Sequence, residues 1–173
     1  FAMSVRAPIG VVGLITPWNF PVAIATWKSF PAIVAGNTFL WKPATETPMM
    51  AYEMAKVFEE AGIPAGVANV VFGSGSDVGT AMIEHPDVKV ISFTGSTETG
   101  RSVAERGGRH LKKVSLEMGG KNAVIVMDDA DLGLAVEGIL WSAFGTAGQR
   151  CTACSRVIVH KDVKEELESL LLT

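Results

Sequence analysis

Two cysteines, Cys151 and Cys154, lie three residues apart in the segment GTAGQRCTACSR. This spacing is compatible with a zinc site, a redox pair, a buried pair, or a pair of which one member is a nucleophile. A zinc site needs four ligands, yet the chain has no second pair of cysteines and its three histidines are scattered. The sequence therefore predicts no metal site.

The order of the predicted elements also argues against a redox pair. A thioredoxin-like motif follows a strand and opens a helix, whereas here a helix precedes the cysteines and a strand follows them. Cys151 comes directly after Arg150, whose positive charge favours the thiolate form of a neighbouring thiol. Cys151 is therefore the candidate nucleophile. Structural burial is the competing interpretation, and it suits Cys154, which lies near the start of the strand.

Two further side chains have the right chemistry to assist a nucleophile. Glu117, in the segment SLEMGGK, is predicted to lie at the apolar end of a strand, where a buried carboxyl group would be a competent general base. Asn19 stands between two prolines and two aromatic residues in PWNFP, which is a rigid mount for an amide donor in an oxyanion hole. The alternatives are an exposed carboxylate at a sheet edge and an ordinary turn asparagine.

The hydrophobic pattern predicts the elements that must position these groups. Short β-rich runs alternate with amphipathic segments, which favours an α/β fold built on an open, mostly parallel sheet. Strands are expected at 9–15, 37–43, 68–73, 88–96, 111–120, 122–128 and 156–160, and helices at 21–35, 46–62, 76–85, 97–108, 131–145 and 163–172.

Glycine- and proline-marked corners follow four of the predicted strands, at the end of the sheet where such folds bind ligands. GSGSDVG (73–79) follows a strand and opens a helix, but its spacing is not that of the dinucleotide fingerprint. FTGSTETG (93–100) repeats the arrangement one unit later and offers Gly95 and Ser96 to a second phosphate. Together the two loops favour a nucleotide-like ligand over simple turns, with Lys42 beside them at the end of another strand.

Composition excludes several other classes. The 173 residues are 48% hydrophobic and 19% charged, which is typical of an ordinary folded domain. A net charge of −3 with no basic cluster argues against nucleic-acid binding. The longest apolar stretch is interrupted by Lys28 and prolines, so no membrane span is expected. With no visible secretory signal and only two cysteines, a reducing, cytoplasmic setting is expected.

Five ordered motifs carry a resemblance to a known family. PWNFP, WKPATETP, FTGSTETG, LEMGGK and FGTAGQRCTA, in this order, resemble the NAD(P)-dependent aldehyde dehydrogenase superfamily over essentially the whole chain. The resemblance implies a Rossmann-like nucleotide-binding core over 1–120. It also implies that 121–173 is the first part of the catalytic domain, which carries the nucleophile.

The resemblance also implies catalytic roles. Cys151 would attack an aldehyde to form a thiohemiacetal, which passes a hydride to the cofactor and becomes a thioester. Asn19 and the backbone N–H of Cys151 would stabilise the oxyanion, and Glu117 would activate the water that hydrolyses the thioester. Cys154 would have no catalytic role.

The cofactor implied by the resemblance is NADP or NAD. Thr45 occupies the place where NAD-selective members carry a glutamate that binds the ribose hydroxyls, so a 2′-phosphate would not be repelled and Lys42 could pair with it. NADP is therefore the expected preference. The residues expected to contact the cofactor are Thr16, Pro17, Trp18, Lys42, Thr45, Gly75, Gly79, Gly95, Ser96 and Glu98.

Family members are more than twice as long, so the chain is expected to be a fragment that lacks most of the catalytic domain. Three functions remain open: a truncated aldehyde dehydrogenase, a cofactor-independent thiol esterase that uses the same cysteine, and a non-catalytic nucleotide-binding or assembly module. The expected partners are a small aldehyde or ester and further copies of the chain. An open, apolar strand edge at RVIVH would favour such a homo-oligomer.

Overall fold

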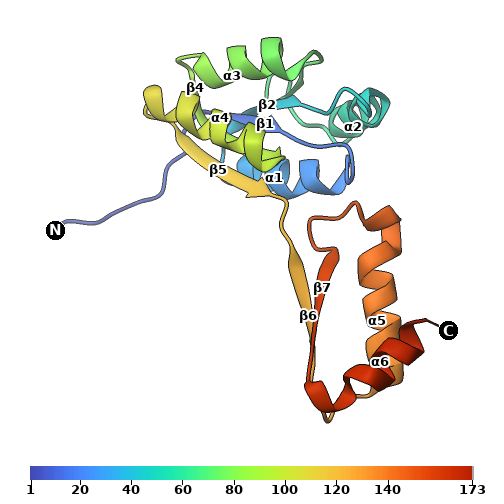
Figure 1. Cartoon of the computed structure of the whole chain (residues 1–173). Coiled ribbons are helices and arrows are strands. Elements are labelled where there is room, and N and C mark those ends of the chain that lie inside the picture. The colour runs from blue at the N-terminus through green and yellow to red at the C-terminus, as the bar shows by residue number, and fades with distance from the viewer. Residues whose placement is uncertain (173) are drawn as a thin grey trace. The chain divides into compact units, whose positions relative to one another are not determined.

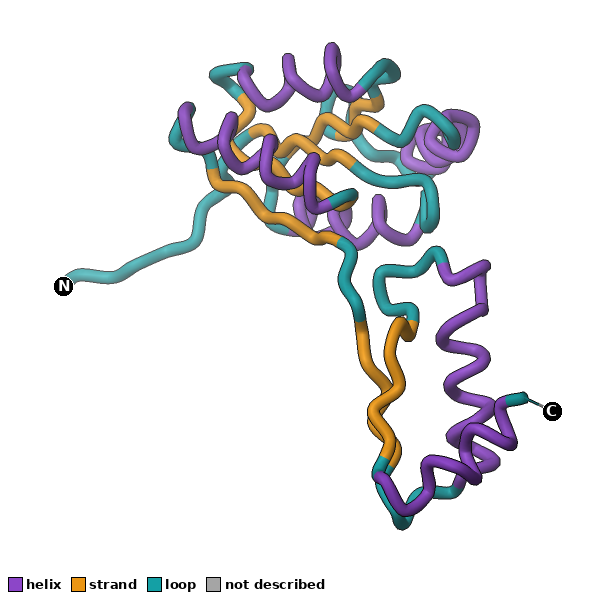
Figure 2. The backbone as a smooth tube through the Cα atoms, in the orientation of Figure 1, coloured by secondary structure: helices purple, strands orange, loops and turns teal. Residues whose placement is uncertain are grey.

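The computed structural model describes residues 1–172 and divides into two compact units, with the boundary between Met118 and Gly119. Each unit is built around its own parallel sheet, with helices connecting the strands (Figures 1 and 2). No helix among residues 1–172 is long and apolar enough to cross a lipid bilayer.

The first unit contains a five-stranded sheet in the order β3-β2-β1-β4-β5, and every pair of neighbouring strands is parallel. This confirms the predicted α/β fold with a parallel sheet. Its elements are β1 (Val11–Ile15), α1 (Ala23–Val34), β2 (Thr38–Lys42), α2 (Pro48–Glu60), β3 (Ala68–Val70), the π-helical turn η1 (Gly75–Gly79), α3 (Thr80–Glu84), β4 (Val88–Gly95), α4 (Thr97–Arg109) and β5 (Lys113–Met118).

The alternation of side chains along the central strands creates two hydrophobic cores, one on each face of this sheet. On one face, Leu14 of β1 and Trp41 of β2 pack with residues of α1 and α2, including Phe58. On the other face, Ile91 of β4 packs with residues of α3 and α4, including Val103. Figure 1 shows α3 and α4 on the side of the sheet opposite to α1. The helices therefore cover both faces, and the ligand-accessible parts are the strand ends.

Helix α4 lies close to β5 because it presents glycines at the contact. A Cβ atom added to Gly107 would lie 2.5 Å from Cγ2 of Val114, and one added to Gly100 would lie 2.5 Å from the sulfur of Met118. Side chains at these two positions would force the helix away from the strand. The glycines thus allow α4 to lie close against β5.

The second unit pairs β6 (Asn122–Val126) in parallel with β7 (Cys154–Val159), and two helices pack on one face of this pair. These are α5 (Leu132–Phe144) and α6 (Lys164–Leu171), with short 3-10 turns at η2 (Gly145–Gly148) and η3 (Lys161–Val163). Asp131 caps α5 by accepting a hydrogen bond from the backbone N–H of Leu134 at 3.0 Å. The small core is formed by Val126, Ile139 and Leu167.

Candidate active site

The carboxyl ends of the parallel strands gather the residues that the sequence predicts to bind a cofactor. Ile15, the last residue of β1, is paired with Lys42 at the end of β2 on one side and with Phe93 of β4 on the other. The loops that follow these strands therefore start from one edge of the sheet. Each predicted residue lies in a strand end, in the turn that follows it or in the first helical turn after it. These residues are Thr16, Pro17, Trp18, Asn19, Lys42, Thr45, Gly75, Gly79, Gly95, Ser96 and Glu98.

Thr16 ties the first two of these loops together. Its hydroxyl accepts a hydrogen bond from the indole N–H of Trp41 at 2.8 Å, and its backbone N–H donates to the carbonyl of Lys42 at 3.2 Å. Both Thr16 and Trp41 are buried. The start of the TPWNF loop is thus anchored in the hydrophobic core, and the residues that follow Thr16 emerge in a fixed direction.

Lys42 is a nearly buried cation, with 5% of its surface exposed. Its ammonium group donates to the carbonyl of Pro43 at 2.9 Å, and Gly79 borders its aliphatic chain, since a Cβ there would lie 3.9 Å from Cδ. Burial lowers the pKa of Lys42 below the usual 10.5, while the negative charge of Glu46 acts in the opposite direction. Thr45 is exposed beside it and donates to the Glu46 carboxylate at 3.3 Å.

The two glycine-serine loops are closed by serine caps. Ser74 accepts a hydrogen bond from the N–H of Asp77 at 3.0 Å and donates to its carboxylate at 2.7 Å. Ser96 accepts from the N–H of Thr99 at 3.1 Å and so begins α4. Each cap fixes the backbone of the first helical turn, which is where a phosphate group would approach.

Glu117 and Asn19 lie in the same unit, and the environment of Glu117 differs from the expectation. Asn19 is half-buried in the turn after β1, whereas Glu117 is exposed near the end of β5. The predicted burial of the carboxyl group is therefore wrong for this chain, because β5 is the last strand of its sheet and leaves this side chain uncovered.

Sequence reasoning missed a lysine that faces Glu117. Lys28 of α1 donates to the hydroxyl of Ser92 in β4 at 2.9 Å. Burial lowers the pKa of Lys28, and the charge of Glu117 partly restores it. Lys28 is the one charged residue of α1, and this was the available signal. A cation is thus held within electrostatic range of the candidate base.

The two cysteines have different environments in the second unit. Cys151 is exposed, whereas Cys154 is half-buried at the start of β7. The thiol of Cys154 donates to the carbonyl of Arg156 at 3.2 Å, and its backbone N–H donates to the hydroxyl of Ser142 at 3.2 Å. Both thiols are free. The accessible thiol is therefore the one that the sequence singles out as nucleophile.

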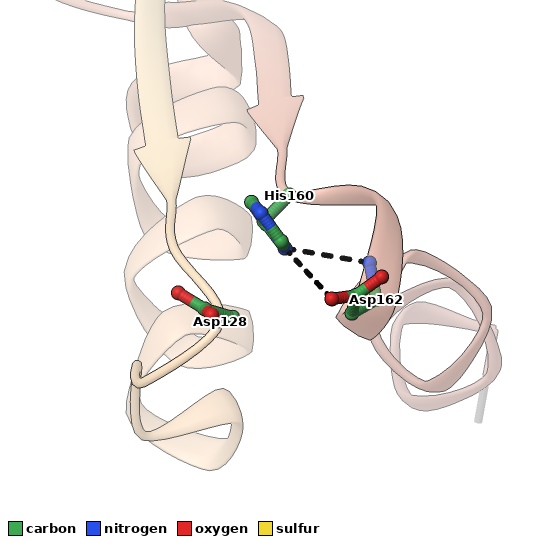
Figure 3. A group of neighbouring side chains, drawn as sticks. All are labelled: Asp128, His160 and Asp162. Carbon is green, nitrogen blue, oxygen red and sulfur yellow. Dashed lines mark hydrogen bonds and ion pairs between the residues drawn. The ribbon is translucent and has the colours of Figure 1, made fainter.

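One group of side chains in the second unit has ligand-like atoms near one another. Asp128, His160 and Asp162 bring one such atom each to within 4.8 Å of the others (Figure 3). His160 already caps the turn η3, because its Nδ1 accepts a hydrogen bond from the N–H of Asp162 at 3.4 Å and lies 3.8 Å from that carboxylate. Both aspartates are exposed. This arrangement is a capping interaction, and we assign no metal to it.

The turn before Cys151 contains strained backbone. Thr146 and Ala147 both adopt left-handed conformations, with φ values of 56° and 53°, and Gly148 follows with a φ of 70°. Such values are uncommon for residues other than glycine and are least favourable for a β-branched residue. Strain of this kind is concentrated at functional sites.

Replacing Thr146 with glycine is expected to stabilise the second unit by about 1 kcal/mol, because relief of left-handed strain exceeds the entropy that glycine adds to the unfolded chain. Glu137→Gly, on the exposed face of α5, is the matched control and should destabilise by about 1 kcal/mol. Urea unfolding measures both changes. Destabilisation by Thr146→Gly would show that the left-handed turn carries no strain.

Comparisons with known proteins agree on one family. The model of the aldehyde dehydrogenase family matches residues 1–173. The alpha-ketoglutaric semialdehyde dehydrogenase of Bacillus subtilis is 51% identical over 169 residues, which are 98% of this chain and 35% of that protein. The 2,5-dioxopentanoate dehydrogenase of Saccharolobus solfataricus is 47% identical over 171 residues, which are 98% of this chain and 36% of that protein. The chain thus spans about a third of the length of these relatives.

Solved structures give the same result. An NADP-dependent enzyme from E. coli superposes with a TM-score of 0.93 at 49% identity, covering 96% of this chain and 34% of that one. An aldehyde dehydrogenase from Bacillus cereus in complex with NAD+ superposes with a TM-score of 0.92 at 42% identity, covering 95% and 34%. The family match over the whole chain and the shared fold lead to one conclusion: the chain belongs to the aldehyde dehydrogenase family.

Proposed function

We propose that the chain carries the cofactor-binding core and the nucleophile of an NAD(P)-dependent aldehyde dehydrogenase, which oxidises an aldehyde to a carboxylic acid. Residues 1–120 form the nucleotide-binding part, and 121–173 form the first part of the catalytic domain. The observation that carries this proposal is the exposed Cys151 thiol, in a chain whose other cysteine is held by hydrogen bonds at the start of a strand.

The carboxyl edge of the larger sheet has the chemistry to hold a dinucleotide. Lys42 presents a nearly buried ammonium group, and an anionic or hydrogen-bonding ligand would stabilise the charge of such a group. The serine-capped turns at Ser74 and Ser96 place helix starts beside the same edge, where phosphates are favoured. When bound, NAD(P) accepts the hydride that leaves the substrate.

The protein groups would carry out the remaining chemistry. The Cys151 thiolate attacks the carbonyl carbon, a C–S bond forms, and the negative charge moves to the oxygen, where the Asn19 amide and the Cys151 N–H donate hydrogen bonds. Loss of the hydride converts this thiohemiacetal to a thioester. Glu117 then accepts a proton from water, the resulting hydroxide attacks the thioester, and the C–S bond breaks to return the thiolate.

A thiol esterase is the second candidate, because hydrolysis of an activated ester needs the same thiolate and donors but no cofactor. The exposure of Cys151 favours it. A non-catalytic nucleotide-binding or assembly module is the third candidate.

Two assays distinguish these candidates. Incubation with an aldehyde and NADP or NAD, followed at the absorbance of the reduced cofactor, reports the dehydrogenase. Release of p-nitrophenol from p-nitrophenyl acetate without cofactor reports the esterase. Activity in neither assay, together with measurable nucleotide binding, would leave the non-catalytic module as the function.

We also propose that the chain self-associates through the second unit. On the face of the β6–β7 pair away from α5 and α6, the exposed fractions of Ile125 and Ile158 are 67% and 54%. Within residues 1–172 this two-stranded sheet also has two open edges, which favour pairing with another chain. Sedimentation at micromolar concentration should show dimers or larger species, with a melting temperature that rises with concentration. A monomer whose melting temperature is independent of concentration would contradict this.

A further inference from the structure

We propose that Asn122 and Arg150 are positioning residues, which hold the two peptide groups on either side of Cys151 in one orientation. This inference rests on the proposed function in one respect, namely that Cys151 is the nucleophile and that its own N–H faces the developing oxyanion. The hydrogen bonds that carry it lie entirely within the second unit.

Asn122 fixes the peptide group after Cys151. Its side-chain amide donates to the carbonyl of Cys151 at 2.6 Å and to the carbonyl of Ala153 at 3.3 Å. Asn122 is the first residue of β6 and is paired with Cys154 of β7, so its backbone is held by the sheet. One planar amide thus bridges two carbonyls of the turn and connects that turn to the strand pair.

Arg150 fixes the peptide group before Cys151. Its guanidinium donates to the carbonyls of Trp141 and Ser142 at 2.7 and 3.2 Å and lies over the Trp141 ring, 3.9 Å from the centroid. These carbonyls belong to the last turn of α5, where the negative end of the helix dipole favours a cation. The side chain therefore ties the residue before the nucleophile to the end of a helix.

The direction of the Cys151 N–H follows from peptide geometry. The carbonyl of Arg150 accepts a hydrogen bond from the N–H of Ala153 at 3.0 Å. The peptide bond between Arg150 and Cys151 is planar and trans, so the N–H of Cys151 points away from the Ala153 N–H. The N–H is thereby held in one direction before any substrate arrives, which is what an oxyanion donor requires.

This inference predicts a specific kinetic signature, because two reactions of the same thiol differ in their need for the donor. Acylation by p-nitrophenyl acetate passes through an oxyanion, whereas alkylation by iodoacetamide does not. In a Cys154→Ser background, Asn122→Ala should reduce the acylation rate of Cys151 about tenfold or more relative to Cys154→Ser alone. Alkylation should change about twofold or less, since the thiol itself is untouched.

Matched variants separate positioning from general stability. Asn69→Ala removes a similar bridge in the first unit, where the Asn69 amide donates to the carbonyls of Phe39 and Gly66, and it should leave the ratio of the two rates unchanged. Arg150→Met should lower the ratio as Asn122→Ala does. Arg150→Lys should restore part of it, because an ammonium group can still donate to the helix carbonyls.

An unchanged ratio of the two rates in Asn122→Ala would overturn the inference, whether neither rate changes or both fall by the same factor. A wild-type chain that is alkylated but never acylated would refute the proposed acyl chemistry, and amide hydrogen exchange then decides the positioning role. The amides of residues 145–153 should exchange at least about tenfold faster in Asn122→Ala. Unchanged exchange would refute the positioning role as well.

Discussion

Replacing Cys151 with serine is expected to abolish acylation by p-nitrophenyl acetate and any aldehyde oxidation, with a loss of about 1,000-fold or more. A serine hydroxyl is not ionised near neutral pH and has no adjacent base in its own turn. Cys154→Ser should retain most of the wild-type rate, because the Cys154 thiol is half-buried and donates to the carbonyl of Arg156. A serine hydroxyl can make the same hydrogen bond.

Labelling with iodoacetamide tests the same assignment without a substrate. In the two single-cysteine chains, Cys151 should react about tenfold faster than Cys154, because the Cys151 thiol is exposed, whereas that of Cys154 is half-buried and donates a hydrogen bond. Mass spectrometry of the labelled peptides gives both rates. Equal labelling, or faster labelling of Cys154, would contradict the assignment of the nucleophile.

The elements of this fold could be predicted because each one has a local signal. The buried strand β1 is a continuous apolar run, α5 begins at the capping residue Asp131, and the sheet edge is marked by glycine- and proline-rich corners. The position of the candidate cofactor residues then follows, because the carboxyl ends of parallel strands meet at one edge. None of these steps needs a contact between distant residues.

The rest of the site depends on contacts that are distant in the sequence. Lys28 lies within the field of Glu117, which is far along the chain, and the amide of Asn122 reaches the carbonyl of Cys151, 29 residues away. Thr146 adopts a left-handed conformation, whereas a β-branched residue prefers a negative φ, so its residue type alone predicts the wrong conformation. The exposure of Glu117 follows from which strand lies last in the sheet, and strand order has no local signal.

Introducing a carboxylate at position 45 is expected to reverse the cofactor preference. The wild-type chain should bind NADP more tightly than NAD, because Thr45 is uncharged and Lys42 can pair with a 2′-phosphate. In Thr45→Glu the new charge repels that phosphate and accepts hydrogen bonds from the ribose hydroxyls of NAD. Each effect is worth about tenfold in affinity, so the ratio of the two dissociation constants should shift about 100-fold towards NAD.

Thr45→Gln is the matched control, because it adds similar bulk without charge and should change the two affinities about equally. The ionisation of Lys42 gives a second test, through pH. Burial lowers the pKa of Lys42 below 10.5, and only the protonated form attracts the phosphate. The preference for NADP should therefore decline as the pH rises towards this lowered pKa of Lys42, while the affinity for NAD changes less. Calorimetric titrations at two pH values measure these affinities. Tighter binding of NAD than NADP by the wild-type chain would refute the preference, and an unchanged ratio in Thr45→Glu would show that position 45 lies away from the ribose.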